Sequence, residues 1–324
     1  MTTSWRTLLA ASLLLSATTV FAAPKAKLRV LTPKAPASGK YMFIAYGDTR
    51  SNPEVHRAVI KAIVRLHPEF VLQSGDLVAR GGKASEWDEF ASITQPLRDA
   101  HIAYYPARGN HDVGPYYARF VTAPYDSGNP YYYAFTRHGS RFIILDSMDP
   151  EEFAPKSAQQ KWLVGELQKA QKTALNTFVM FHESAYSIGP HGPTPDAQRY
   201  LHPLFVKYHP RAVFCGHDHL YYRTTRDGVP YFVTGGGGAP LYTPDNKQLA
   251  IPGDVYASVH HVIRCEVDGS RVTFTALCLD GSAIPVHGPS PTVTVVGAGG
   301  TGSARAIPAT PGGAVIDKIT LGPK

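Results

Sequence analysis

Five short polar blocks, each directly after an apolar run, hold the residues of this sequence best suited to chemistry. They are Gly47-Asp48, Gly75-Asp76, Gly109-Asn110-His111-Asp112, His182 and Gly216-His217-Asp218-His219. Their side chains offer carboxylate oxygens, an amide oxygen and imidazole nitrogens. Such a donor set, free of thiolates, suits zinc, manganese or iron rather than copper(I) or an iron–sulfur cluster. One four-coordinate zinc ion needs fewer ligands than these blocks offer, so the sequence predicts two divalent metal ions of uncertain identity.

The charge of such a centre indicates the kind of substrate it would bind. Two divalent ions bring four positive charges, and two carboxylates with one bridging hydroxide cancel three of them. The centre therefore stays positive and suits a phosphate group. Water bound to such ions ionises near neutral pH, which supplies a nucleophile for phosphoester hydrolysis.

A repeated strand–helix–strand pattern explains how blocks so far apart in sequence can meet. Residues 41–46 and 69–73 are apolar runs typical of strands, and residues 54–66 between them have apolar positions at helical spacing. This order predicts a parallel crossover unit. Because ligands gather at the carboxyl ends of parallel strands, the polar blocks are expected to lie at one edge of a sheet.

The same pattern continues along the chain and then changes. Further helices are expected at residues 85–98, 157–172 and 195–208, and further strands at 102–106, 141–146, 176–181 and 211–215. The later strands are joined by turns rather than helices and are expected at 220–225, 229–234, 260–267 and 271–279. The sequence therefore predicts a mixed α/β domain with an antiparallel second half and two sheets packed face to face.

The two ends of the chain differ from the predicted core. Residues 1–23 contain Arg6, an apolar run and small residues at the end, which is typical of a signal peptide. Residues 24–40 are rich in Pro, Lys and Ala and indicate a linker. Residues 281–324 are rich in Gly and Pro, with expected strands at 292–296 and 314–321.

Composition supports an exported protein that lacks covalent cross-links. The predicted signal peptide places the protein in the periplasm or the extracellular space. No later stretch is apolar and long enough for a transmembrane anchor. Cys265 and Cys278 lie on opposite arms of an expected hairpin but out of register, so they and Cys215 are expected to be free and buried.

The net charge of +7, which includes Arg6 of the predicted signal peptide, has two interpretations. It suits either an anionic substrate or cell envelope, or simply a soluble basic surface. No run of basic residues interleaved with aromatic ones indicates nucleic-acid binding. The sequence gives no prediction of the oligomeric state.

The ordered blocks resemble those of the calcineurin-like metallophosphoesterases. The flanking segments Ser157-Ala-Gln-Gln-Lys-Trp-Leu163, Gly216-His-Asp-His-Leu-Tyr-Tyr-Arg223 and Val233-Thr-Gly-Gly-Gly-Gly-Ala-Pro-Leu241 are similar to the purple acid phosphatase branch. The resemblance covers roughly residues 41–279. It implies a four-layer α/β/β/α sandwich of two mixed sheets over a domain at residues 41–280.

The resemblance also implies roles for the individual residues. Asp76 would bridge two metal ions, with Asn110, His182 and His217 completing one site. Asp48 and His219 would serve the other site. A metal-bridging hydroxide would attack phosphorus while His111 donates a proton to the leaving oxygen. Asp112 would hold the His111 ring.

This sequence departs from the family pattern at two positions. Arg50 stands where many relatives have a histidine ligand, and Ala79 stands where purple acid phosphatases have a tyrosine ligand. Arginine stays protonated and offers no lone pair. The site formed by Asp48 and His219, called the first site below, therefore lacks one protein ligand. Without the tyrosine, ferric iron and a purple colour are in doubt.

Further interpretations concern Arg50, His191 and a glycine run at residues 235–238. Arg50 has two readings, a contact to a substrate phosphate or a salt bridge to a nearby acid. His191 either touches substrate from a loop over the site or belongs to a plain loop. Residues 235–238 are four consecutive glycines that are expected to let the backbone pass close to the metal centre.

The sequence thus favours a metal-dependent phosphoester hydrolase that acts on a small phosphorylated substrate, with a phosphomonoesterase preferred. A phosphodiesterase acting on nucleotide or lipid-derived diesters is the first alternative. A non-catalytic metal- or phosphate-binding module is the second alternative, because Arg50 replaces one protein ligand of the first site. His111 argues against the binding module, since mere binding needs no proton donor.

Overall fold

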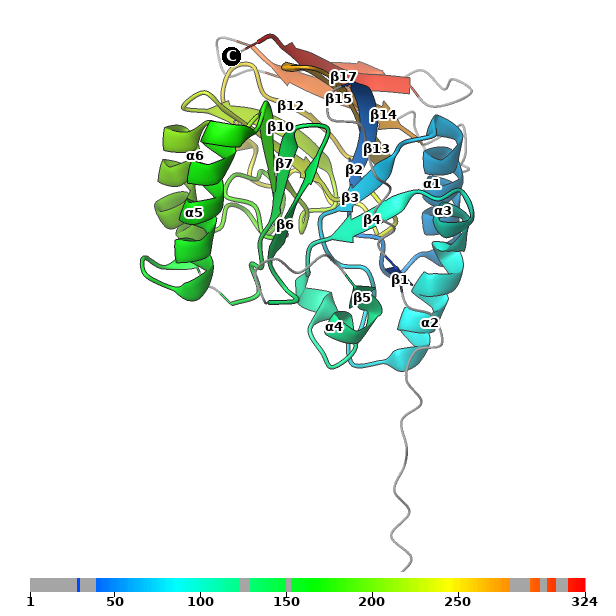
Figure 1. The fold of residues 1–324 in the computed structure, drawn as a ribbon. Coiled ribbons are helices and arrows are strands. Elements are labelled where there is room, and N and C mark those ends of the chain that lie inside the picture. The colour runs from blue at the N-terminus through cyan, green and yellow to red at the C-terminus, as the bar shows by residue number, and fades with distance from the viewer. Residues whose placement is uncertain are drawn as a thin grey trace, which may run out of the picture.

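The computed structural model describes residues 28–29, 39–122, 129–149, 153–279, 292–297, 302–306 and 314–323. Within them, two large β-sheets pack face to face and helices cover their outer faces (Figure 1). The four-layer α/β/β/α sandwich and the two mixed sheets are therefore confirmed. Among these described residues, none of the helices has the length and apolar character that crossing a membrane requires.

The first sheet has six strands and combines both ends of the domain. Its order is β17 (Ala314–Leu321), β14 (Arg271–Cys278), β13 (His261–Asp268), β2 (Lys40–Tyr46), β3 (Phe70–Gln73) and β4 (Ala103–Pro106). Strands β2, β3 and β4 are parallel, as predicted. Strand β2 also pairs antiparallel with β13, so a strand from the start of the domain adjoins one from near its end.

Three helices cover the outer face of the six-stranded sheet: α1 (Pro53–Leu66), α2 (Ala84–Ile93) and α3 (Gln95–Asp99). Helix α1 begins with a proline in its first turn, and the Asn52 side chain caps it by accepting from the amide of Val55 at 3.3 Å. The helix expected at residues 85–98 is divided at Thr94, which lies between α2 and α3. Its hydroxyl donates to the carbonyl of Phe90, four residues earlier.

The second sheet has nine strands. Its order is β16 (Gly302–Ala306), β15 (Thr292–Val296), β12 (Val255–Ala257), β10 (Tyr221–Arg226), β11 (Val229–Thr234), β9 (Ala212–Cys215), β8 (Asn176–Met180), β7 (Ser140–Ile144) and β6 (Tyr133–Arg137). The outer face of this sheet is covered by helix α5 (Ala158–Thr173), the π-helical segment η3 (Ala197–Leu201) and helix α6 (His202–Tyr208). The strands β6, β12 and β16 were not predicted from the sequence.

Smaller elements complete the described chain. Strand β1 (Leu28–Arg29) pairs parallel with β5 (Val121–Thr122), which follows helix α4 (Tyr117–Phe120). The short 3₁₀ helices are η1 (Asn110–Asp112) and η4 (Lys247–Leu249). Residues 1–27 and 30–38, which hold the predicted signal peptide and most of the predicted linker, lie outside the described residues. The domain boundaries therefore stay predictions.

Aromatic side chains from both sheets fill the space between them. The ring of Phe43 on β2 lies 5.4 Å from Phe142 on β7 and 5.3 Å from Phe178 on β8, and all three are fully buried. Edge-to-face contacts of this kind add to the stabilisation gained from burial. This core holds the two sheets in a fixed relation, which the site at their edge requires.

The strands predicted within the C-terminal segment are present and join the core. β15 belongs to the nine-stranded sheet and β17 to the six-stranded sheet. Asp317 on β17 accepts a hydrogen bond from the hydroxyl of Tyr221 at 2.6 Å and pairs with Arg223, both on β10. The last strand therefore connects the two sheets through an ion pair.

The prediction for the cysteines is confirmed. Cys265 lies opposite Phe274 and Cys278 opposite His261, so the two thiols stand on different rungs of the hairpin. Together with Cys215, they are free and buried.

Candidate metal centre

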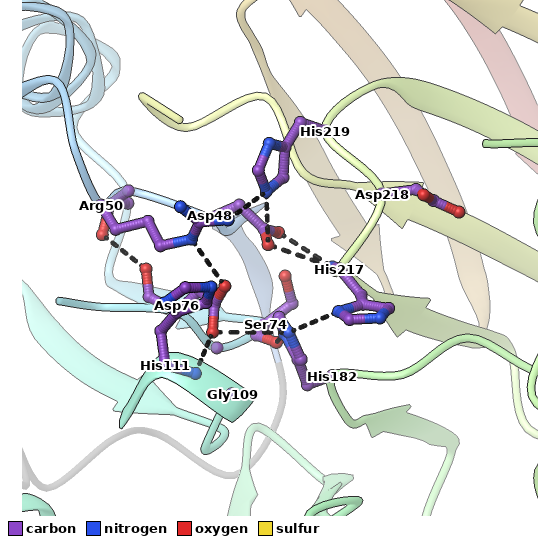
Figure 2. A network of polar contacts seen from close by, with 12 residues as sticks. Asp48, Arg50, Ser74, Asp76, Gly109, His111, His182, His217, Asp218 and His219 are labelled. Atoms are coloured by element: carbon purple, nitrogen blue, oxygen red, sulfur yellow. Dashed lines mark hydrogen bonds and ion pairs between the residues drawn. The ribbon is translucent and has the colours of Figure 1, made fainter. Parts of the chain in front are cut away.

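The polar blocks gather at the carboxyl ends of strands from both sheets. Asp48 follows β2 and Asp76 follows β3, while His182 follows β8 and His217 follows β9. Asn110 begins η1, shortly after β4. The predicted convergence of these blocks is therefore confirmed (Figure 2).

Three of the expected donors adopt a backbone conformation that is rare for their residue types. Asp48 and Asp76 each have a φ of 58°, and His217 has a φ of 72°. Residues other than glycine seldom adopt this left-handed backbone conformation, and such strain is concentrated at functional sites. The turn after each strand thus directs its donor toward the cluster at the carboxyl ends of the strands.

Two buried carboxylates and a histidine form the centre of the cluster. One ligand atom each from Asp48, Asp76 and His182 lies within 4.8 Å of the others, and all three side chains are buried. Burial, and then the neighbouring Asp76 carboxylate, raises the pKa of Asp48 well above its ordinary value. A cation between the carboxylates would remove this repulsion.

The histidines present lone pairs rather than protons to the centre. Nδ1 of His182 donates to the carbonyl of Ser74 at 2.9 Å, and Nδ1 of His219 donates to the carbonyl of Pro240 at 2.7 Å. Each ring therefore keeps Nε2 free as an acceptor. Burial lowers the pKa of His182, and it lowers that of His219 to about 4, so both are neutral at pH 7.

One half of the cluster consists of acceptors that face one another. Nε2 of His182 lies 3.0 Å from Oδ1 of Asn110, 3.5 Å from Oδ1 of Asp76 and 3.3 Å from Nδ1 of His217. Burial, followed by the nearby His182, lowers the pKa of His217 to about 3. Neutral imidazoles, an amide oxygen and a carboxylate brought together in this way suit a divalent cation.

The other half of the cluster contains Asp48, His219 and Arg50. Oδ1 of Asp48 lies 3.7 Å from Nε2 of His219, and the amide of His217 donates to the Asp48 carboxylate at 3.1 Å. The Arg50 Nε donates to Oδ2 of Asp76 at 3.0 Å. Arg50 therefore forms the salt bridge that was one of its two readings, and its side chain points at the donors (Figure 2).

His111 lies beside the cluster, but its ring is not held as expected. Its Nδ1 donates to the carbonyl of Ala79 at 2.8 Å, and its backbone amide donates to Oδ1 of Asp76 at 3.0 Å. Asp112 instead accepts from the backbone amides of Asp76, Leu77, Val78 and Gly109 at 2.8–3.1 Å. The expectation that Asp112 holds the His111 ring is corrected, because four amides already take up its buried carboxylate.

His191 lies in a loop against the cluster. Its ring centroid is 4.0 Å from that of His217, and its Nδ1 and backbone amide contact Oδ1 of Asp218 at 3.0 and 3.1 Å. The side chain is 41% exposed, so one face remains accessible to solvent. The structure thus brings His191 next to the donors.

The prediction that residues 235–238 pass close to the centre is confirmed. The amide of Gly237 donates to the carbonyl of Gly47 at 2.8 Å. A Cβ added to Gly235 would lie 2.2 Å from the carbonyl oxygen of Asp218 and 3.0 Å from Oδ2 of Asp48. Only glycine allows this approach of the backbone.

Two residues near the centre were not singled out from the sequence. The Tyr242 ring stacks on His219 with centroids 4.0 Å apart. The buried Asp218 carboxylate orients His191 and accepts from the hydroxyl of Ser187. Asp218 lies between two predicted ligands, which was a usable signal, whereas Tyr242 lies in a segment without a motif.

Comparisons with known proteins agree with this geometry. The model of the calcineurin-like phosphoesterase family matches residues 41–221. The chain is 26% identical over 236 residues to tartrate-resistant acid phosphatase type 5 of Oryctolagus cuniculus, which covers 60% of this chain and 72% of that protein. It is 30% identical over 177 residues to a purple acid phosphatase of Glycine max, which covers 48% of this chain and 37% of that protein.

A solved structure shares the fold. The purple acid phosphatase PPD1 of Lupinus luteus superimposes with a TM-score of 0.66 at 19% identity, over 78% of this chain and 54% of the lupin chain. The chain thus spans only about a third to a half of these plant relatives. On the match across most of the described core, the chain belongs to the calcineurin-like phosphoesterase family of metal-dependent phosphoester hydrolases, in its purple acid phosphatase-like branch.

Proposed function

We propose that this chain is an exported phosphomonoesterase that works with two divalent metal ions. The observation that carries the proposal is the convergence of the donor atoms of Asp48, Asp76 and His182 within 4.8 Å. Export rests on the signal-like residues 1–23. The similarity to acid phosphatases of rabbit and soybean favours a monoester substrate.

The proposed ligands divide into two unequal sets. Asp76 would be shared, while Asn110, His182 and His217 would complete one set and Asp48 and His219 the other. The acceptors that face one another around Nε2 of His182 support the set that includes Asn110 and His217. When bound, such ions supply positive charge for phosphate oxygens and a water ionised near neutral pH.

The protein's own groups would handle the proton and orient the substrate. Nδ1 of His111 donates to the carbonyl of Ala79, so Nε2 carries a transferable proton only when the ring is an imidazolium. We propose that this imidazolium gives its Nε2 proton to the leaving oxygen and becomes neutral. Asp112 would act by fixing the backbone of the turn that carries Asp76 and by holding Gly109 beside it. His191, next to His217 and partly exposed, would contact the substrate.

A substrate comparison tests the proposed monoester preference. We expect kcat/KM for p-nitrophenyl phosphate to exceed that for bis(p-nitrophenyl) phosphate by at least about tenfold, a transition-state difference of about 1.4 kcal/mol. Both esters should be assayed with zinc, manganese and iron salts, because the oxygen and imidazole donors suit all three metals. A preference for the diester would support a phosphodiesterase instead. Tight metal binding without turnover of either ester would support a binding module.

We also propose that Arg50 contacts a substrate phosphate, the other of its two interpretations, and this contact has its own test. With metal saturating, Arg50→Ala is expected to raise KM for p-nitrophenyl phosphate by roughly tenfold, since charge-assisted hydrogen bonds are each worth about 1.5–3 kcal/mol. The Michaelis constant of Arg57→Ala, which removes an exposed arginine from α1, should stay unchanged. An unchanged kcat/KM in Arg50→Ala would show that Arg50 does not contact the phosphate.

A further inference from the structure

The protein's own cation already lies on the donors of one half of the centre. Arg50 Nε bonds Oδ2 of Asp76 at 3.0 Å, and its Nη2 lies 3.5 Å from Nε2 of His219. These atoms belong to two residues proposed above as ligands of the first ion, and this inference rests on that proposed function. The guanidinium therefore contacts groups that a first ion would need.

Neighbouring groups keep the guanidinium in this position. Its Nη1 donates to the hydroxyl of Ser51 at 3.3 Å, and only 15% of the side chain is exposed. The ring of Tyr242 stacks on His219, and its hydroxyl lies within hydrogen-bonding reach of the Arg50 guanidinium. An ion entering this half must break the bond between Arg50 and Asp76 and overcome these further contacts.

The charges around the centre also weaken cation binding in the half beside Arg50. The carboxylates of Asp48 and Asp76 bring two negative charges, and Arg50 cancels one of them. One divalent ion among the acceptors around His182 then makes the cluster positive. A second ion beside Arg50 would meet both a positive guanidinium and an already positive centre.

The structure offers room for Arg50 to move aside. A cavity of about 470 Å³ adjoins the cluster, and Arg50 forms part of its wall. Glu86 and Glu89 line this cavity together with Arg80 and Lys83. Both carboxylates already pair with cations, Glu86 with Arg80 and Lys83 and Glu89 with Arg57, so a displaced guanidinium would share them. The first half is thus obstructed by a movable side chain rather than permanently filled.

We propose that Arg50 competes with the first metal ion for Asp76 and His219, so that the centre holds one ion tightly and the other weakly. The tight ion takes the half formed by Asp76, Asn110, His182 and His217. The weak ion enters only when Arg50 leaves Asp76. Arg50 thereby sets the metal concentration at which the centre becomes binuclear.

A calorimetric titration of the full chain with Mn²⁺, after removal of bound metal with a chelator, tests this proposal. The wild type is expected to bind one Mn²⁺ tightly and a second with at least about tenfold weaker affinity, equal to about 1.4 kcal/mol. Arg50→Ala and Arg50→Gln should both raise the affinity of the weaker site at least tenfold. The glutamine variant removes the charge but retains much of the side-chain length. Arg65→Ala loses the same charge from an exposed position in the last turn of α1 and should bind like the wild type.

Two outcomes would overturn the proposal. One is equal affinity for two ions in the wild type, and the other is a second site that stays weak in both Arg50 variants with unchanged thermal melting. Phosphoester turnover is measured separately from the titration. Unequal affinities that disappear in the Arg50 variants, without hydrolysis of any ester, would uphold this inference and overturn the proposed function. Hydrolysis with two equal sites would do the reverse.

Discussion

Replacing Asp76 with asparagine is expected to lower kcat/KM for p-nitrophenyl phosphate by roughly a thousandfold, the order reached when one group that stabilises transition-state charge is removed. Asp76 is buried and contacts Arg50 and the amide of His111, and it lies beside His182. Asparagine keeps the shape but removes the negative charge, so both halves of the centre lose a shared anionic donor. The measurements are steady-state kinetics in excess Mn²⁺ and the metal content of the purified protein.

The matched control is Asp268→Asn. Asp268 ends β13, pairs with Lys40 and is 57% exposed, so its replacement should change neither rate nor metal content. Retention of both metal and rate in Asp76→Asn would remove Asp76 from the proposed centre.

His111→Ala is expected to lower kcat by roughly a hundredfold to ten-thousandfold while leaving the metal content unchanged, the range observed for loss of general acid catalysis. The ring contacts the carbonyl of Ala79 and is not among the proposed ligands. The loss should be smaller for p-nitrophenyl phosphate than for an alkyl phosphate, because nitrophenolate leaves without protonation. Equal losses on both esters would contradict a role as proton donor.

Asp112→Ala provides the comparison that separates chemistry from folding. Removing its carboxylate leaves four buried backbone amides without their acceptor, and each such group costs about 1–3 kcal/mol. The free energy of unfolding should therefore fall by several kcal/mol in Asp112→Ala, as measured by urea denaturation. It should stay near the wild-type value in His111→Ala.

The parts of the fold that follow local patterns were predictable. The helical spacing of residues 54–66 gave α1, and the apolar runs before Asp48 and Asp76 gave β2 and β3. The pairing of β2 with β13 was not predictable, because nothing in either strand specifies a partner so distant in sequence. The short strand β12 lacks the length that makes alternation detectable.

The site shows the same division. Residue type and position after a strand were enough to assemble the donors, because strand ends meet at one edge. Hydrogen-bond partners were a different matter. The sequence placed Asp112 beside His111, but the backbone turn after Asp76 decides which donors reach its carboxylate. The direction of Arg50 likewise depends on the left-handed turns at Asp48 and Ser51, which local composition does not reveal.

The pairing of β2 with β13 has a consequence for the order of events during synthesis. Asp48 extends from the end of β2, whose neighbours in the sheet are β3 and β13. A ribosome completes β3 early but β13 only after most of the domain has been made. His217 and His219 also emerge late, so a nascent chain lacks most of the nitrogen donors for much of its elongation. The proposed metal centre can therefore form only after β13 has been made, in whichever compartment the chain folds.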